Sequence, residues 1–393
     1  MSESALPSIP RATDDPAPDI VAQRLALCEE ACGEALPYLG GAELPLALAR
    51  GNIENMIGYA QVPIGIAGPL QVEGREGLRE LYVPMATTEG AMVASYSRGM
   101  RLLAAGGGAR ARVIKDGLSQ HPILVYTSLD LAIAACELAP SMRTRFEAIV
   151  AGITQHGSLR AVEPQVIGRR LVLRLVFGTG DAIGINMAAQ ATDLCARELA
   201  AATGATACYV HGQDVEKRAN ARAMVEGRGR SVIAEVRIPR EALEQIGRAR
   251  PEDLVAISRT YRTGYAQLGT QNWTIQAANG LAAIFLACGQ DVAYVVESAT
   301  GQLDLELEPD GALYAALTLP SLLIGTVGGG SGKGTAHECL QLMGCAGAGR
   351  VEVFAEAIAA TILAGDISLM AAFVSDEFVS AHESLGRNRP ESI

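Results

Sequence analysis

The 393-residue sequence contains few aromatic and few charged side chains. Aromatic residues make up 4% of it and charged residues 19%, whereas hydrophobic residues make up 49%. So much apolar material supports a sizeable core, and the length fits one large domain with an insertion or two ordinary domains. The net charge is −11 and no basic stretch is visible, so the composition argues against a nucleic-acid partner.

The sequence also lacks a continuous apolar span, a secretory signal and a Cys-x-x-Cys pair. Residues 263–290 carry no charge but are interrupted by Gln and Asn, and residues 311–332 contain Pro320 and three consecutive glycines. Neither stretch fits a bilayer crossing. Residues 1–18 have no basic or apolar region of a signal peptide, and we expect a disordered tail there. The eight cysteines are expected to be thiols in a reducing compartment, which predicts a cytoplasmic protein without a membrane partner.

Three motifs fail when their spacing is checked. The string GGGSGKGT (328–335) has Val327 where a phosphate-binding loop needs its first Gly, and Gly334 where it needs Ser or Thr. The string FGTGDAIG (177–184) has its third Gly one position too late for a dinucleotide fingerprint. His337 and Cys339 have no matching second pair of ligands, so we expect no metal.

Periodicity divides the chain into several segments. Helical patterns cover 19–35, within an N-terminal helical segment over 19–53, and 89–105, which we expect to begin at a Thr cap at Thr87 or Thr88. Strand and helix patterns alternate over 122–209, which predicts a small α+β domain. Further strands are expected near 231–239 and 301–319, and a helix from 351 to about 382. Residues 273–288 are apolar nearly all round, as a buried central helix would be.

Seven ordered blocks of sequence resemble the hydroxymethylglutaryl-CoA reductase family, most closely its class I branch. They are ENMIGYAQVPIGIAGPL (54–70), PMATTEGAMVASYSRG (84–99), GTGDAIGINM (178–187), EGRGRSVIAEVRIP (226–239), ACGQD (287–291), PSLLIGTVGGG (320–330) and GDISLMAAFVSDEFVSAH (365–382).

The resemblance implies an α+β fold, with a large substrate and CoA domain over 54–121 and 210–375 built around a buried central helix. A ferredoxin-like NADP-binding domain would be inserted at 122–209, and residues 376–393 would form a C-terminal catalytic flap. It also implies a homodimer with active sites between subunits, and a place in the mevalonate pathway of isoprenoid synthesis.

The family reaction reduces 3-hydroxy-3-methylglutaryl-CoA to mevalonate and free CoA with two hydrides from NADPH. Such chemistry needs an acid for the carbonyl oxygen, a second acid for the departing thiolate and a dry pocket. By resemblance, Glu89 is the acid for the carbonyl, a role that requires burial. Lys217 stabilises the developing alkoxide and is held by Asp291. His382 protonates the CoA thiolate, because imidazole titrates near about 6.5 and a thiol near about 8.5.

The resemblance also supplies cofactor and substrate residues. Arg145 lies where the family places an Arg near the 2′-phosphate, which favours NADPH over NADH, and Phe146 follows it. Asn279 matches an Asn that faces the substrate. The dinucleotide segment matches at Asp181, Ala182, Ile183, Gly184, Ile185 and Asn186.

The sequence departs from the family around the acyl group. The Arg that binds the acyl carboxylate is replaced by Gln120, a His is replaced by Gln276, and the Asp-Lys-Lys of the substrate loop reads Glu216-Lys217-Arg218. Either another cation compensates, such as Lys115 or Arg218, or the natural acyl group differs. Two alternatives therefore remain, namely a reductase for another acyl-CoA and a non-catalytic homologue that binds CoA or NADP.

Overall fold

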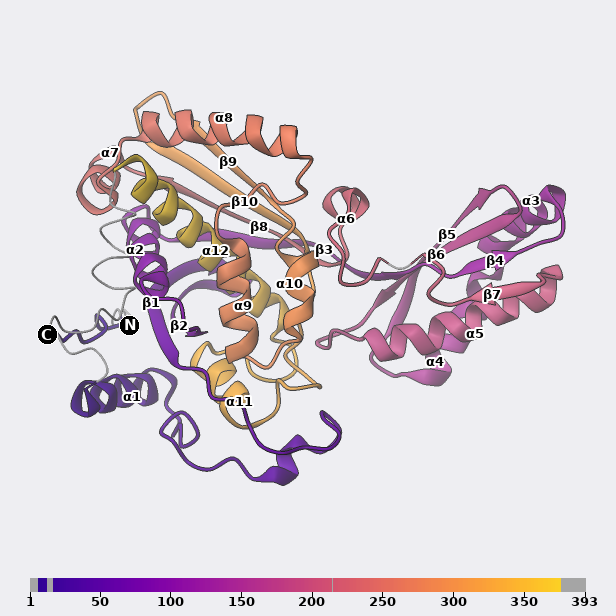
Figure 1. Ribbon diagram of the computed structural model, residues 1–393, viewed down its shortest axis with the longest axis horizontal. Helices are drawn as coiled ribbons and strands as arrows, with labels where there is room; N and C mark the ends of the chain where they lie inside the picture. Colours follow the sequence, from indigo (N-terminus) through magenta and orange to yellow (C-terminus); the bar gives the residue numbers. More distant parts are fainter. Residues whose placement is uncertain (1–5, 13–16, 214, 376–393) are drawn as a thin grey trace, which may run out of the picture.

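The computed structural model describes residues 6–12, 17–213 and 215–375. Figure 1 shows a large lobe, which contains most of the helices, and a smaller lobe at the opposite end of the long axis. The long strand β3 (Ala109–Gln120) runs between them: Arg110–Gly117 pairs with β8 (Gly229–Ile238) in the large lobe, and Leu118–Gln120 pairs with β6 (Arg170–Gly178) in the small one. The protein is thus a mixed helix and sheet structure in which most strand pairs are antiparallel.

The sheet of the large lobe continues through β8 to β10 (Leu313–Leu322) and β9 (Gln302–Leu307), all antiparallel. On the other side, β1 (Ile64–Gly74) makes a short parallel contact with β3 and a long hairpin with β2 (Gly77–Ala86). The helix α12 (Val351–Val374) packs against several of these strands and against α2 (Met92–Ala105).

The central helix of the large lobe is α12, and the expectation that residues 273–288 fill this role was wrong. Nearly all side chains of α12 are buried, and its apolar character runs right round the helix. The helix α9 (Ala277–Ala287) is shorter and leaves Ala278, Asn279 and Leu286 exposed along one side. By length and composition α12 could cross a membrane, but it lies inside the lobe, as the core helix of a folded domain does.

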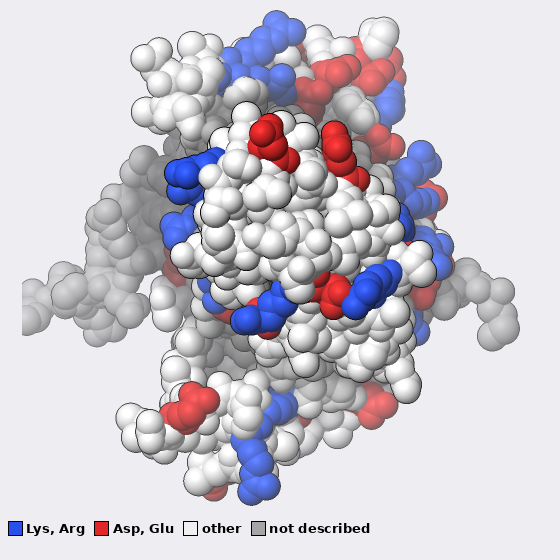
Figure 2. Space-filling model, turned by 90° about the vertical axis from the view of Figure 1, so that its right-hand side faces the viewer, with Lys and Arg blue, Asp and Glu red and all other residues white. Residues whose placement is uncertain are grey.

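The small lobe contains four antiparallel strands in the order β7-β4-β6-β5. Along the chain they follow the pattern β-α-β-β-α-β, with helices packed against the sheet. The elements are β4 (Ile123–Val125), α3 (Leu129–Leu138), the 3-10 turn η2 (Ala139–Met142), α4 (Arg143–Ile153), β5 (Ser158–Ile167), β6, α5 (Ile185–Thr203) and β7 (Ala207–Tyr209). Viewed from this end, the surface is largely uncharged, and Figure 2 shows no continuous basic patch on it.

Shorter elements complete the large lobe. The N-terminal region contains α1 (Pro18–Cys32) and the 3-10 turn η1 (Leu46–Ala49). Elsewhere lie α6 (Ala221–Glu226), α7 (Arg240–Ala242), the π-helical turn η3 (Leu243–Gly247), α8 (Pro251–Leu268), η4 (Val292–Tyr294), α10 (Val295–Ser298) and α11 (Gly334–Leu342).

Two local expectations were wrong. The helix α2 begins at Met92, after Ala91 in a left-handed conformation, and has no side-chain cap; Thr87 instead accepts the N–H of Glu89 at 3.0 Å in a local turn. Residues 6–12, expected within a disordered tail, contact the large lobe: Leu6 and Ile9 pack beside Cys28 and Tyr82. The hydroxyl of Tyr82 also donates to the carbonyl of Pro7. Residues 1–5 and 13–16 of that tail, and residues 376–393, lie outside the described residues.

Candidate active site

Lys217 and Asp291, far apart in the sequence, form an ion pair. Lys217 lies in the loop between β7 and α6, and Asp291 directly precedes η4. The Nζ of Lys217 is 2.9 Å from one carboxylate oxygen of Asp291, while the other oxygen accepts the main-chain N–H of Ala293 at 3.0 Å. Both charged side chains are 43% exposed, so the pair stands open to a molecule from outside.

A buried network that the sequence reasoning missed lies beneath this pair. The guanidinium of Arg228 donates two hydrogen bonds of 2.9 Å to Glu297, and both side chains are fully buried. Glu297 also accepts the main-chain N–H of Lys217. The hydroxyl of Tyr294 donates to Glu216, and the ring of Tyr294 lies under the ammonium of Lys217. We call these six residues the Lys217 network: Glu216, Lys217, Arg228, Asp291, Tyr294 and Glu297.

Glu89 and Asn279 line a different feature, a cavity of about 1380 Å³ in the large lobe. It lies between α1, β1, the start of α2 and the start of α9. Glu89 is exposed in this single chain, so the burial that its expected acid role requires is not present here. Four guanidinium groups belong to the same cavity, those of Arg11, Arg24, Arg98 and Arg101.

Gln276 is held in the packing of the helices. Its Nε2 donates to the Ser95 hydroxyl at 3.4 Å and to the carbonyl of Gly365, and its main-chain N–H donates to Asp366 at 2.8 Å. Gln276, which stands where the family has a His, also forms part of the wall of the cavity beside Glu89.

The two groups of candidate residues lie at opposite ends of α9. Asn279 is in its first turn, and Asp291 follows its last residue, Ala287. The eight residue-to-residue steps from Asn279 to Ala287 alone rise about 12 Å along the axis. The described part of one chain thus brings Lys217 and Asp291 together, but does not bring them to Asn279 or to the cavity that Glu89 lines.

The segment expected to bind the cofactor has mixed roles. Asp181 caps α12: its carboxylate accepts the N–H groups of Gly349 at 2.8 Å and Val351 at 3.2 Å. Ile183 and Ile185 pack on the core, whereas Asn186 is exposed. Asp181 therefore has a structural task that joins the two lobes, which the sequence pattern did not indicate.

Gly184 precedes the 19-residue helix α5 in a left-handed conformation, with φ 81° and no side chain to cap the helix. A Cβ on Gly184 would come within 2.4 Å of Thr179, so only glycine fits. The first N–H groups of α5 consequently have no side-chain cap, which is the arrangement that anions favour at helix N-termini.

Arg145 and Phe146 differ in solvent exposure. The guanidinium of Arg145 is exposed and lies 2.5 Å from Glu198 on α5, where it can meet a ligand. Phe146 is completely buried in the core of the small lobe, so the expectation that it contacts the cofactor was wrong. On the helix α4, successive side chains are rotated by about 100° around the axis, which explains why only one of the two is available.

The position of the missing Arg carries no cation. Gln120 is 4% exposed, and its Nε2 has no partner among the described residues. Next to it, burial and nearby guanidinium groups lower the pKa of His121 to about 3, so the imidazole is neutral. The exposed ammonium of Lys115 donates to the carbonyl of Glu226, and Arg218 lies exposed in the loop; compensation by either cation stays a prediction. His382 lies outside the described residues.

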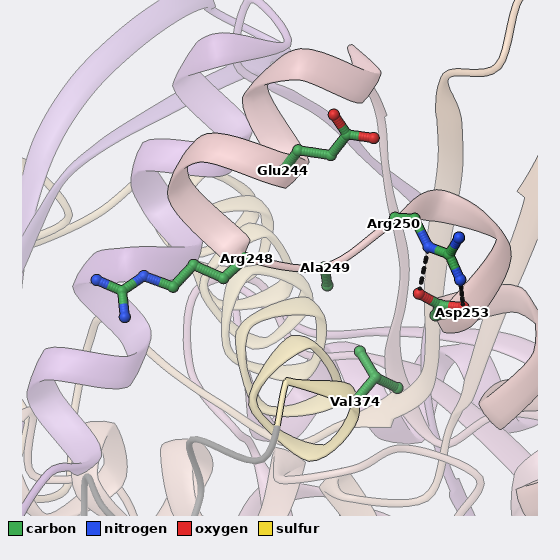
Figure 3. Close-up of a pocket in the computed structure, with 6 residues that line it drawn as sticks. All are labelled: Glu244, Arg248, Ala249, Arg250, Asp253 and Val374. Atoms are coloured by element: carbon green, nitrogen blue, oxygen red, sulfur yellow. Dashed lines mark hydrogen bonds and ion pairs between the residues drawn. The ribbon is translucent and has the colours of Figure 1, made fainter.

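A second, smaller cavity of about 380 Å³ lies at the end of α12 (Figure 3). Arg250 and Asp253 form an ion pair there, with 2.8 Å between the guanidinium nitrogen and the carboxylate oxygen. The side chain of Arg248 points away from Val374. This cavity contains none of the groups that thioester reduction needs.

Comparison with known proteins identifies the family. The family model described as hydroxymethylglutaryl-coenzyme A reductase matches residues 20–387. The 3-hydroxy-3-methylglutaryl-coenzyme A reductase of Methanothermobacter thermautotrophicus is 38% identical over 95% of this chain and 94% of its own length. The enzyme of the same name from Haloferax volcanii is 40% identical over 93% and 92%.

Among solved structures, the class II 3-hydroxy-3-methylglutaryl-CoA reductase from Streptococcus pneumoniae bound to NADPH has the same fold. Its TM-score is 0.73, with 20% identity, and the match covers 90% of this chain and 97% of that one. These structures are of class II, so they do not support the expected class I assignment. With a family model and close relatives that span nearly its whole length, the chain belongs to the hydroxymethylglutaryl-coenzyme A reductase family.

Proposed function

We propose that this protein reduces 3-hydroxy-3-methylglutaryl-CoA to mevalonate and free CoA, with NADPH as the reductant. The observation that carries the proposal is the Lys217–Asp291 ion pair, which joins two of the expected catalytic groups across 74 residues of sequence. Relatives of this chain that carry the reductase name cover almost all of it.

Lys217 would stabilise the charge that develops on the substrate oxygen. A positioned cation at such an oxygen contributes a few kcal/mol to the transition state, on the order of a hundredfold or more in rate. Asp291 would pair with the ammonium through one oxygen, while its other oxygen accepts the N–H of Ala293. Glu89 would deliver the proton to that oxygen, and His382 would protonate the departing thiolate.

NADPH would bind to the small lobe, and when bound it supplies the hydride. The start of α5, kept open by Gly184, would receive the pyrophosphate, with Asp181, Ile183, Ile185 and Asn186 shaping the approach. Arg145 would pair with the 2′-phosphate, because a guanidinium matches that dianion and its side chain is 67% exposed. The open helix N-terminus and the exposed guanidinium fit this cofactor; Phe146 would act only by supporting Arg145 from the core.

The CoA part of the substrate would occupy the cavity beside Glu89. The cavity is mainly apolar, as a pantetheine arm requires, and guanidinium groups line it, as phosphates require. Asn279, at one end of this cavity, would orient the acyl group.

A second subunit would complete the site. Glu89 with Asn279, and Lys217 with Asp291, lie at opposite ends of α9, and a two-fold axis beside α9 would bring one end against the other end of its copy. Exposed apolar side chains on α9, η4 and α10 support an interface: Leu286, Val292 and Val296 are each at least 44% exposed. We therefore infer a homodimer with shared active sites.

The finer structural assignments are part of the same proposal. The β-α-β-β-α-β order of the small lobe, with strands arranged β7-β4-β6-β5, supports a ferredoxin-like domain inserted at 122–209. The remaining described residues from 54 to 121 and 210 to 375 would form the substrate domain, and 376–393 the flap. The seven sequence blocks support the class I branch, and the buried position of α12 supports a cytoplasmic protein.

The test is an assay with purified protein, NADPH and 3-hydroxy-3-methylglutaryl-CoA. Reduced cofactor is followed by absorbance and CoA by thiol release; two NADPH consumed per CoA released supports the proposal. Lys217→Met should lower kcat by two to three orders of magnitude. Lys333→Met, at a half-buried lysine bonded to Asn52 and remote from the Lys217 network in sequence, is the control. No turnover by the unmodified protein would exclude the proposed reaction.

One observation favours a second candidate, a reductase of an acyl-CoA whose far end is uncharged. In the Lys217 network three carboxylates face two cations, and the neighbouring position holds Gln120 and a neutral His121. A carboxylate of the acyl group would find no cation supplied by this pair. Higher kcat/KM for an acyl-CoA with a neutral end than for 3-hydroxy-3-methylglutaryl-CoA would favour this candidate.

A further inference from the structure

Three side chains from one short helical run contact Lys217. Asp291 pairs with its ammonium at 2.9 Å, the Tyr294 ring lies 5.0 Å from Nζ, and Glu297 accepts its main-chain N–H. The three are spaced three residues apart across η4 and α10, so they lie on the same side of that run. Only Asp291 is expected from the family pattern.

Lys217 needs more than Asp291 to stay in place. A half-exposed Lys–Asp pair contributes little to ordering its side chains, because solvent screens the attraction and the rotamer entropy of the lysine side chain opposes it. In addition, Lys217 has a φ of 56°, a left-handed conformation that non-glycine residues seldom adopt. The ion pair alone therefore does not account for a single position of the ammonium.

Glu297 fixes the main chain of Lys217. Its carboxylate is fully buried and neutralised by Arg228, whose Nε donates to the carbonyl of Ser119 on β3 at 3.1 Å. A buried ion pair held by several hydrogen bonds does not move easily, because separating its members would leave a charge without a partner. The N–H of Lys217 is thereby attached to β3 and β8, the strands that run toward the small lobe.

Tyr294 fixes the side chain of Lys217. Its hydroxyl donates to Glu216, the residue before Lys217, and the side chain is 3% exposed, so the ring is rigid. Burial, followed by the contact with Glu216, raises the pKa of Tyr294, and the hydroxyl remains a donor. A cation beside an aromatic face is attracted by the negative charge density of the ring, so the Tyr294 ring favours this position of the ammonium.

We propose that Tyr294 and Glu297 are positioning residues for Lys217. The ring of Tyr294 keeps the ammonium beside Asp291, and the carboxylate of Glu297 holds the main chain of Lys217. The inference rests on the proposed role of Lys217 in stabilising the substrate oxygen. Neither residue touches the substrate, so removing either should affect turnover more than binding.

The first experiment separates the ring from the hydroxyl. Tyr294→Leu removes both, and Tyr294→Phe keeps the ring. We expect Tyr294→Leu to lower kcat about tenfold, with the KM for NADPH and for the thioester within about twofold, and Tyr294→Phe to recover kcat to within about threefold. Tyr314→Phe, which also removes a Tyr–Glu hydrogen bond (2.8 Å, to Glu235), is the matched control and should leave kcat unchanged.

The second experiment does not depend on activity. The chain has three lysines, Lys115, Lys217 and Lys333. An amine-acylating reagent, followed by peptide mass spectrometry, reports the labelling rate of each. Labelling of Lys217 should rise several-fold in Tyr294→Leu and in Glu297→Gln, relative to Lys333 in the same molecule, and should not change in Tyr314→Phe.

The results distinguish this inference from the proposed function. An unmodified protein without reductase activity, but with faster labelling of Lys217 in the variants, would retain the positioning role and reject the reaction. Unchanged labelling of Lys217, an equal loss of kcat in Tyr294→Phe and Tyr294→Leu, or a rise in KM at constant kcat would overturn the positioning role.

Discussion

The carboxylate of Asp366, in the middle of α12, accepts the main-chain N–H of Gln276 at 2.8 Å and that of Ile275 at 3.1 Å. This contact joins the central helix to the beginning of α9, three residues before Asn279. Burial raises the pKa of Asp366 to about 7 and outweighs the two N–H groups, which lower it. A contact that orients the start of α9 thus involves a group that titrates near neutrality.

Asp366 should make stability depend on pH. Its carboxyl keeps a proton in the folded chain up to about pH 7, whereas in the unfolded chain it ionises near its ordinary value of 3.8. Ionisation therefore stabilises the unfolded state relative to the folded state as pH rises from 4 to 7. The contribution of Asp366 to the free energy of unfolding is lost over that window.

The measurement is denaturant unfolding of the wild type and of Asp366→Asn between pH 4 and 8. The free energy of unfolding of the wild type, relative to that of the variant, should fall by a few kcal/mol as pH rises through this window. Since asparagine does not titrate, other groups cancel in the comparison. A difference that is the same at every pH would contradict the assignment.

Gly99 allows α2 and α12 to pack closely, because it has a hydrogen atom where other residues have a Cβ. A Cβ on Gly99 would lie 1.9 Å from the carbonyl oxygen of Ala364, so the two helices touch backbone to backbone. Gly99→Ala should lower the free energy of unfolding by about 1–3 kcal/mol or more. Gly264→Ala, on the open side of α8, is the control and should be neutral or stabilising by up to about 1 kcal/mol. Equal thermal stability of the two variants would show that the helices can separate without loss.

Asp181 should act on stability more than on cofactor affinity. Because it caps α12, Asp181→Ala should lower the free energy of unfolding by about 1–2 kcal/mol. Thermal unfolding of the apo protein measures this, and the KM for NADPH, measured well below the transition, should change less than threefold. A large rise in that KM with unchanged stability would mean that Asp181 contacts the cofactor and does not serve chiefly as a cap.

Local patterns predicted most of the helices and strands of the small lobe. The apolar run of β6 and the periodicity of α5 were sufficient, because each element buries one face against the next. The hairpin β1–β2 and strand β5 were not recognised, since Gly68, Pro69 and Pro164 interrupt their patterns. The identity of the central helix could not be read from hydrophobicity alone, because α9 and α12 are both strongly apolar and only the packing decides between them.

The residues around Lys217 could be predicted from the sequence only in part. The pairing of Lys217 with Asp291 followed from family resemblance, but the contacts that hold Lys217 depend on Tyr294 and Glu297, whose spacing of three residues is a signal only once η4 and α10 are known to be helical. Phe146 was assigned to the cofactor from its neighbour, although adjacent residues of a helix face different ways. The separation of Glu89 from Lys217 by the length of α9 required coordinates.

The central claim is that two copies of the chain share each active site. Glu89→Gln and Lys217→Met, each inactive alone, are mixed and allowed to exchange subunits. If Glu89 of one copy works with Lys217 of the other, exchange of equal amounts makes half of all dimers heterodimers, each heterodimer carries one intact site of its two, and about a quarter of wild-type activity should return. Activity that stays at the level of the separate variants after verified exchange would contradict a shared site, and with it the account of how these residues meet.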